Sequence, residues 1–330
     1  MSSPNYTTVF APETGNEAVV AKFYERLLLE MAIPNLQFGR FALSRTLPQR
    51  KSNTMILTRP DLPTVSNPVE LTAGVTPPPI NLTQTRYEIK IKEFGNYIQL
   101  DDVYEYTTRD PFLRMRSEQL IEHSKMYIDT IFRDLLQSTA STLVCTRGNN
   151  QLPITELNRE DLVSTIIEIR KAMGRPIAHH IESSPDFATS PVPESFIAIS
   201  SVDLIGDLLA LPNFLRRDHY GHRQIYEGEY GAMDEIRFLT TQLSTPTSMS
   251  LTVNGNQQTV SVYNNIILAR NAYGRVGLGS EGVRLIHAPL GSAGSADPLA
   301  QRATMGYKFF LGAAILMDGW VVNLQSTQGV

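Results

Sequence analysis

Thr54-Met55-Ile56-Leu57-Thr58 and Tyr87-Glu88-Ile89-Lys90-Ile91-Lys92 are two β-type runs that flank a proline-rich stretch, and together they decide the fold. Seven of the chain's 20 prolines lie between Pro48 and Pro79. A two-stranded ribbon alone is marginal in water. We therefore predict that residues 47–100 form an extended arm without a core of its own. Such an arm needs another surface to lie on, which indicates a protein built to assemble.

The returning strand of this arm has two different faces. Alternation places Tyr87, Ile89 and Ile91 on one face and charged residues on the other. A solvated strand face is the alternative reading for Lys90 and Lys92. We predict that eight residues of the arm make inter-subunit contacts: Met55, Ile56, Leu57, Tyr87, Ile89, Lys90, Ile91 and Lys92.

Size and composition indicate a globular protein. The chain has 330 residues, with 42% hydrophobic and 19% charged residues and a formal net charge of −4. This length permits two interleaved subdomains. The mild acidity gives no electrostatic reason to expect a grip on DNA or on an anionic membrane. No run approaches the ~18 apolar residues of a membrane helix, and residues 1–10 do not read as a signal peptide.

The single cysteine, Cys145, excludes a disulfide within the chain and suits a reducing cytoplasm. Because it follows Leu143 and Val144, we interpret it as a small core residue.

Helical signals occur at four places. A capping box at 14–17 opens an amphipathic segment to Met31. The longest apolar repeat predicts a spine helix over 111–144, with Asp110 as N-cap and a length of about 50 Å. Asn158 opens a further helix that Gly174 stops, and Ser201 opens another that ends at Pro212.

Strand signals alternate with these helices without a regular βαβ rhythm. They fall at 195–199, 236–239, 262–269 and 282–287, with a hairpin at 250–263 that turns at Asn254-Gly255. Residues 175–193 indicate a surface loop, and the apolar segment 307–324 carries the only tryptophan. This mixed order predicts an α+β fold.

Candidate chemistry is weak throughout. The motif G-x-G-x-x-G at 277–282 lacks the helix that a dinucleotide site requires, so a turn between strands is favoured. Histidines at 179–180, 219 and 222 lack the converging ligands of a zinc site. The acidic pairs 101–102 and 227/229 do not form a calcium loop and are read as caps or subunit salt bridges. No G-x-S-x-G elbow is present. We predict no catalytic residues, no metal and no cofactor.

Four stretches carry a resemblance, and they occur in a fixed order: 71–77 (LTAGVTP), 94–102 (FGNYIQLDD), 228–238 (GEYGAMDEIRF) and 297–308 (DPLAQRATMGYK). Together they resemble the major capsid proteins of tailed bacteriophages with the Hong Kong 97 fold, in particular the group typified by N4-like phages. The resemblance covers nearly the whole chain.

This resemblance implies a domain plan. It gives an N-terminal arm over 1–45 and an extended loop over 46–85. A peripheral domain with the spine helix takes 86–150 and 276–312. An axial domain takes 151–275 and 313–330.

The resemblance also implies a structural, non-enzymatic function. Pentamers and hexamers of the chain would build an icosahedral head around double-stranded DNA, without sequence-specific binding and away from membranes. A separately encoded scaffolding protein, a portal and decoration proteins are the expected partners. The protein would reside in the virion after assembly in the host cytoplasm. An encapsulin-like nanocompartment and a cytoplasmic enzyme with an unrecognised site are the alternatives.

Overall fold

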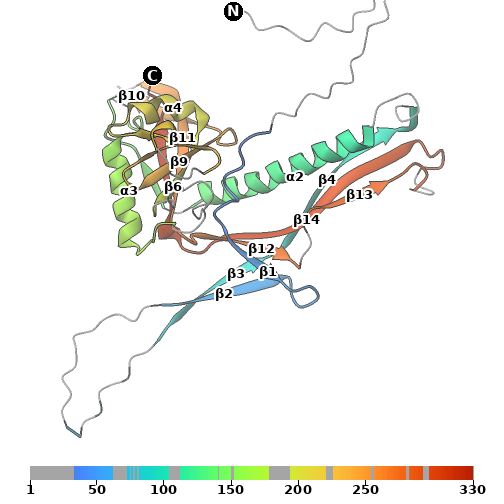
Figure 1. Ribbon diagram of the computed structural model, residues 1–330, viewed down its shortest axis with the longest axis horizontal. Coiled ribbons are helices and arrows are strands. Elements are labelled where there is room, and N and C mark those ends of the chain that lie inside the picture. The colour runs from blue at the N-terminus through green and yellow to red at the C-terminus, as the bar shows by residue number, and fades with distance from the viewer. Residues whose placement is uncertain are drawn as a thin grey trace, which may run out of the picture. The chain divides into compact units, whose positions relative to one another are not determined.

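Three β-sheets and a long helix make up the described part of the chain (Figure 1). The computed structural model describes residues 33–61, 73–74, 76, 79, 82–103, 112–139, 141–149, 152–177, 194–220, 226–253, 256–279, 282–292 and 297–329. Residues 34–330 form one compact unit. The capped segment at 14–31, the helix start at 110–111, the loop at 178–193 and the turn at 254–255 lie outside the described residues.

The first sheet is built around one long strand, β14 (Arg302–Ile315). It pairs antiparallel with β4 (Lys92–Asp101), β13 (Arg284–Ala288) and β12 (Tyr273–Leu278). The fifth strand, β1 (Leu43–Leu47), pairs parallel with β12. This arrangement confirms the strand expected at 282–287.

Helix α2 (Phe112–Gln137) covers one face of this sheet. Every second residue of β14 from Ala303 to Leu311 is buried. Those from Met305 to Leu311 join one core cluster with Leu120, Phe132 and Leu136 of the helix. Alternation along the strand thus meets the apolar stripe of the helix.

The predicted end of this helix at residue 144 is wrong. At 1.5 Å per residue, the 26 residues of α2 span about 39 Å. The chain then forms β5 (Thr142–Val144), which pairs parallel with β15 (Val321–Thr327). Hydroxyl groups compete with helical hydrogen bonds here: Thr142 Oγ1 donates to Thr139 O over 3.3 Å.

The second sheet has eight strands in the described part of the chain. In spatial order, they are β5, β15, β11 (Asn256–Leu268), β6 (Phe196–Ser201), β9 (Ile236–Thr241), β8 (Glu229–Met233) and β7 (Leu215–Arg216), with β10 (Thr247–Val253) also on β11. Strands β10 and β11 confirm the predicted hairpin.

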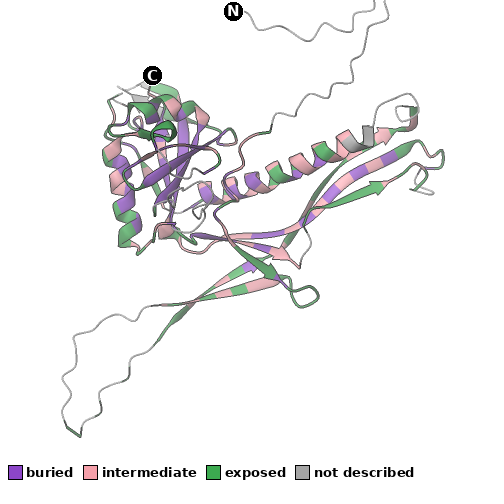
Figure 2. Cartoon of the chain, in the orientation of Figure 1, coloured by how far each residue is buried: buried purple, intermediate pink, exposed green. Residues whose placement is uncertain are grey.

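The centre of this second sheet is buried on both faces. All residues of β6 and β9 are buried (Figure 2). Ile197 and Ile199 of β6 face the same cluster as α2, whereas Phe196 and Ala198 face a second cluster. Near-continuous apolar strands are typical of sheets covered on both sides. Cys145 is fully buried in the second cluster, as predicted.

Shorter helices flank the second sheet. Asn158 caps α3 (Arg159–Lys171) by accepting from the backbone N–H of Glu160, which confirms the predicted start. Ser201 caps a short 3-10 turn, η2 (Val202–Leu204), that continues into α4 (Ile205–Ala210). Two further 3-10 turns are η3 (Arg217–His219) and η5 (Asp318–Trp320).

The third sheet is the ribbon of β2 (Thr54–Pro60) and β3 (Gln84–Lys90), which pair antiparallel. The return strand was predicted to run to Lys92, but β3 ends at Lys90, and Ile91 separates it from β4. The backbone N–H of Ile91 donates to Asn53 O over 2.9 Å. The ribbon is mostly exposed or half-buried (Figure 2).

Candidate assembly site

The base of the ribbon is rooted in the chain's own core. Ile89 is only 1% exposed and forms a small cluster with Leu47 of β1 and Val276 of β12. Met55, Leu57, Ile91, Leu278, Ala314 and Leu316 pack against this cluster. The arm therefore has a small core at its base, which differs from the prediction that it has none.

Two glycines make room for Ile89. A side chain at Gly312 would place its Cβ 2.9 Å from Ile89 Cγ2, and one at Gly274 would place it 3.3 Å from Ile89 Cδ1. The first separation is shorter than carbon atoms tolerate, so the close approach of β3 to β14 depends on glycine at 312.

The opposite face of the ribbon is bare. Ile56 is 55% exposed, and its antiparallel partner Glu88 and the neighbouring Lys90 are also exposed. The eight predicted contact residues therefore divide. Met55, Leu57, Ile89 and Ile91 contact the chain's own cluster, half-buried Tyr87 lies under the Arg59 guanidinium at 5.4 Å, and Ile56, Lys90 and Lys92 face outward.

A second element, the strap (residues 34–41), fastens the start of the described chain to α2. The Asp129 carboxylate accepts the backbone N–H groups of Gln37 (3.2 Å) and Gly39 (2.8 Å). Asp129 is 4% exposed, and burial raises the pKa of its carboxyl above the ordinary value, although the backbone donors and Arg133 oppose that shift. The strap is thus held by a buried carboxylate.

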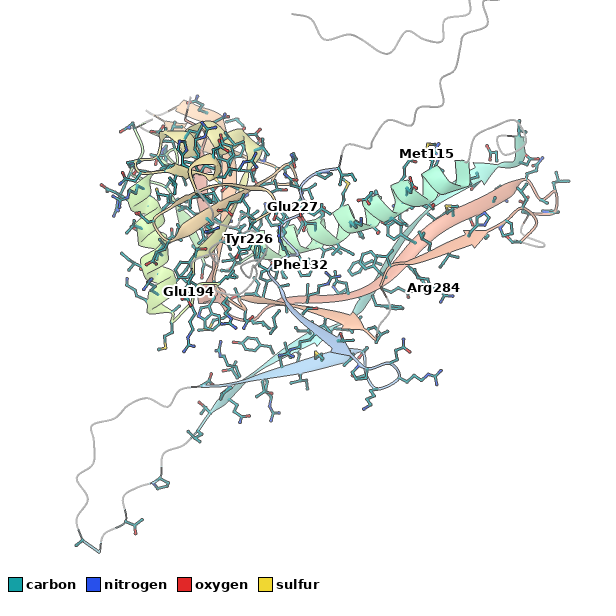
Figure 3. The ribbon with its side chains drawn as sticks, in the orientation of Figure 1. Met115, Phe132, Glu194, Tyr226, Glu227 and Arg284 are labelled. Carbon is teal, nitrogen blue, oxygen red and sulfur yellow. The ribbon has the colours of Figure 1, made fainter. Side chains whose placement is uncertain are left out.

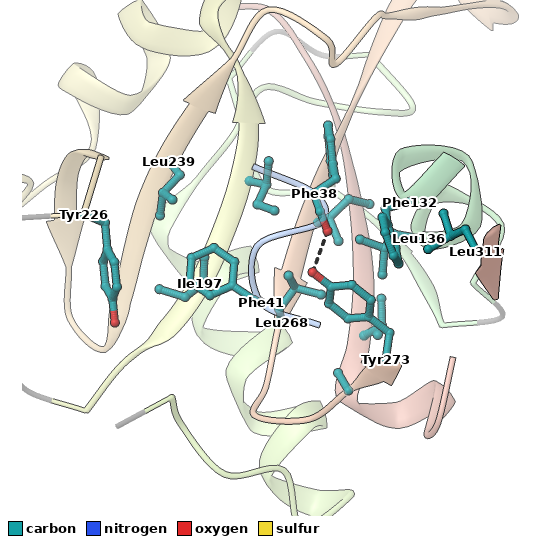
Figure 4. Close-up of a cluster of buried hydrophobic side chains, with 14 of the residues drawn as sticks. Phe38, Phe41, Phe132, Leu136, Ile197, Tyr226, Leu239, Leu268, Tyr273 and Leu311 are labelled. Atoms are coloured by element: carbon teal, nitrogen blue, oxygen red, sulfur yellow. Dashed lines mark hydrogen bonds between the residues drawn. The ribbon is translucent and has the colours of Figure 1, made fainter. Parts of the chain in front are cut away.

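The strap also binds both sheets. The Tyr273 hydroxyl of β12 donates to Phe38 O over 2.5 Å (Figure 4). The Thr241 hydroxyl of β9 donates to Asn35 O over 2.7 Å. Because Phe38 is fully buried beside Phe132 of α2, the strap joins the helix and the two sheets into one core.

A buried ion pair joins the neighbouring strands β8 and β9, beside the strap. Glu229 and Arg237 are 0% and 3% exposed at their side chains and lie 3.1 Å apart. Glu229 also accepts from the Tyr220 hydroxyl at 2.8 Å and from the Tyr226 N–H at 2.9 Å. Figure 3 labels Tyr226 and its neighbour Glu227, whose carbonyl accepts from Gln37 Nε2 at 3.0 Å.

This network decides the sequence reading for Glu229 of the acidic pair at 227/229. Glu229 acts as a cap and as the partner of an arginine in the same chain, so it is not a subunit salt bridge. Sequence reasoning missed Arg237 as its partner and Asp129 as the anchor of the strap. One signal for Asp129 was present: it falls in the buried stripe of α2, between Ser124 and Phe132.

The other sequence candidates do not converge on a chemical site. Gly279, inside the glycine-rich motif, has a φ of +60° and donates to Leu47 O over 2.7 Å. A strand, β13, follows it rather than a helix. Asp102 caps the Val103 N–H at 2.7 Å, and His219 lies in η3, while the histidines at 179, 180 and 222 lie outside the described residues.

Three further findings concern the described residues alone. No group of three or more histidine, cysteine or acidic side chains among them could hold a metal ion. No helix among them has the length and apolar character needed to cross a membrane. Burial raises the pKa of the Cys145 thiol to about 12, so this thiol stays protonated and unreactive at neutral pH.

Comparison with known proteins yields matches by structure. No protein-family model matches the sequence, and no curated protein matches it. The structure of the head of Helicobacter pylori bacteriophage KHP40 matches with a TM-score of 0.61 and 14% identity, over 100% of this chain and 98% of that chain. The capsid of Ralstonia phage GP4 matches with a TM-score of 0.63 and 10% identity, over 97% and 99%. The capsid of cyanophage P-SCSP1u matches with a TM-score of 0.61 and 12% identity, over 94% of each chain.

At these identities, the likeness establishes the fold. The chain has the α+β fold of phage capsid subunits, the Hong Kong 97 type, which confirms the fold class expected from the sequence. The likeness extends over nearly the full length of both partners in each comparison.

Proposed function

We propose that this chain is the major capsid protein of a tailed bacteriophage. In this role, it assembles through pentamers and hexamers into an icosahedral head. The observation that carries the proposal is the full-length likeness to subunits of phage heads and capsids. The role is structural, and no catalytic step is assigned to any residue.

The ribbon is the proposed element of assembly. Its base is fixed to the chain's own sheets through Ile89, so its outward face with Ile56 and Lys90 is held in a defined direction, with exposed Lys92 following at the start of β4. Strand-like arms add backbone hydrogen bonds and buried apolar area to a neighbour. Stable contacts bury on the order of 1,200–2,000 Å² each, and a shell subunit makes several.

The proposed content of the shell is double-stranded DNA. A net charge of −4 gives no electrostatic basis for reading sequence, and containment needs none. A separate scaffolding protein, a portal and decoration proteins are the proposed partners. The proposed location is the virion, after assembly in the host cytoplasm. The domain plan inferred from the resemblance belongs to the same proposal.

Electron microscopy tests this function. The purified full-length chain, alone and coexpressed with the phage's scaffolding protein, should form closed shells of uniform diameter. Monomers or dimers under every condition would contradict the proposal. Shells isolated from infected cells should contain DNA, whereas a cellular protein cargo would favour a nanocompartment.

A further inference from the structure

A cleft of about 730 Å³ opens where the ribbon passes the C-terminal end of α3. Its described lining includes four basic side chains, Arg59, Lys171, Arg175 and Arg270, and a single acidic one, Asp61. We refer to it as the basic cleft. Its volume lies within the range of about 300–1,000 Å³ for ligand-binding clefts. A net positive cleft is unexpected on a chain whose net charge is −4.

The acidic residue of the cleft is already partnered. Asp61 lies 3.7 Å from Arg59 and accepts from the Thr85 hydroxyl at 2.8 Å. Lys171 pairs with Glu168 at 2.6 Å. Asp61 and Glu168 thus account for the charge of Arg59 and Lys171, and the excess positive charge lies on the other two arginines.

Arg175 and Arg270 have no ion pair with any residue that the structure describes. Both are exposed, and the backbone N–H of Arg270 donates to Arg175 O over 2.9 Å. That bond joins the two backbone segments, so two guanidinium groups extend from neighbouring positions. Both residues line the basic cleft. An anionic partner in the cleft would gain charge-assisted hydrogen bonds from them.

Apart from Asn271, the remaining described lining of the cleft is apolar. It includes Trp320, Met317 and Met173, and Met173 is 68% exposed. The indole N–H of Trp320 donates to Ala172 O over 2.8 Å, which leaves the ring without a free polar group. Thioether and indole groups bind apolar side chains adaptably. The cleft therefore combines two cations that have no ion pair among the described residues with a mostly apolar surface.

The backbone at the rim supports a binding role. α3 ends with the N–H of Gly174 bonded to Ile169 O and the N–H of Met173 bonded to Arg170 O, both at 2.9 Å. Where a helix ends with these two hydrogen bonds, the residue in the left-handed conformation is usually glycine. In α3 that residue is Met173, with a φ of +61°. An exposed, apolar residue in a costly conformation is typical of a functional position.

We propose that the basic cleft binds an acidic peptide segment of another polypeptide chain, with an apolar side chain beside its carboxylates. Carboxylates would pair with Arg175 and Arg270, and the apolar side chain would lie on Trp320 and Met173. Duplex DNA fits less well for two reasons. Binding to its phosphates uses cations spread along a surface that follows the DNA backbone, and DNA phosphates gain nothing from contact with the thioether and indole groups of the cleft. The cleft lies within one chain, so the proposal does not depend on shell assembly.

Fluorescence anisotropy tests this proposal on the unassembled full-length chain. The probe is a short, fluorescein-labelled, glutamate-rich peptide with one central leucine. The double substitution Arg175→Gln and Arg270→Gln should weaken binding by about tenfold or more, equivalent to 1.4 kcal/mol. Replacing the leucine of the probe by serine should also weaken binding to the unchanged protein.

The matched control is Arg284→Gln on β13, which removes another exposed arginine, outside the cleft, and should change affinity by less than about twofold. Thermal unfolding of each variant checks that the fold is kept. Absence of binding to the unchanged protein, or equal weakening by the control, would overturn the proposal. So would a short DNA duplex that displaces the peptide and itself loses affinity in the double variant, because the cleft would then be a nucleic-acid site.

Discussion

Two regions of the molecule differ in how far their side chains are buried: the sheet around β6 and β9, and the ribbon of β2 and β3. Every residue of β6 and β9 is buried. In the ribbon, only Ile89 is buried, and Ile56 is more than half exposed. The first region is stabilised within one chain. The second is fixed only at its base, and its bare face needs a partner to contribute to stability.

This difference separates two kinds of substitution. A change in the second sheet or under the strap should act on the unfolding of a single chain. A change on the bare face of the ribbon should leave the single chain intact and act on association. The free energy of unfolding and the yield of shells, measured on the same variants, therefore test whether the two regions act independently.

The largest effect is expected at the buried ion pair. Glu229→Gln leaves Arg237 charged and without its carboxylate, which should lower the free energy of unfolding by about 3–5 kcal/mol. Urea denaturation of the unassembled chain measures this. The control is Glu235→Gln, which breaks the exposed pair with Arg170 and should cost less than about 1 kcal/mol. Equal costs at the two positions would contradict the role given to the buried pair.

The ribbon itself should respond differently on its two faces. Ile89→Ala should lower the free energy of unfolding by about 2–3 kcal/mol, because it empties the cluster with Leu47 and Val276. Ile56→Ala should lower it by less than about 0.5 kcal/mol but reduce the yield of shells in electron micrographs. If Ile56→Ala assembles as well as the unchanged chain, the outward face makes no essential contact.

The smallest effect is expected in the pH dependence set by Asp129. Because burial raises its pKa in the folded chain, the folded state binds more protons than the unfolded state between the unfolded value near 3.8 and the raised value. Its contribution to stability is therefore full below that window and is lost as pH rises through the folded pKa. Asp129→Asn should flatten the fall in urea midpoint with rising pH. Asp134→Asn, an exposed change on the same helix, should not.

Local signals in the sequence predicted local structure well. The cap at Asn158, the alternation along β3 and the burial of Cys145 each depend on neighbouring residues, and each is confirmed. The end of α2 was missed because apolar spacing continues past Gln137, whereas pairing of β5 with β15 decides the outcome. That partner strand lies about 180 residues away in the sequence, so no local pattern reveals it.

The candidate site was predicted only in part for the same reason. The ribbon was recognised, but its base was assigned to another subunit because the partners of Ile89 lie on β1 and β12. The strap depends on Asp129, some 90 residues from Gly39. Gly174 was expected to stop α3, and the left-handed residue at this helix end is its neighbour Met173.

The most direct test of the account is a cryo-electron microscopy map of the assembled particle at a resolution that traces side chains. We expect β2 and β3 of one copy to lie across a neighbouring copy, with Ile56 buried between the two chains and Ile89 buried in its own. A closed shell in which Ile56 of every copy remains solvent-exposed and the ribbon touches only its own chain would contradict it.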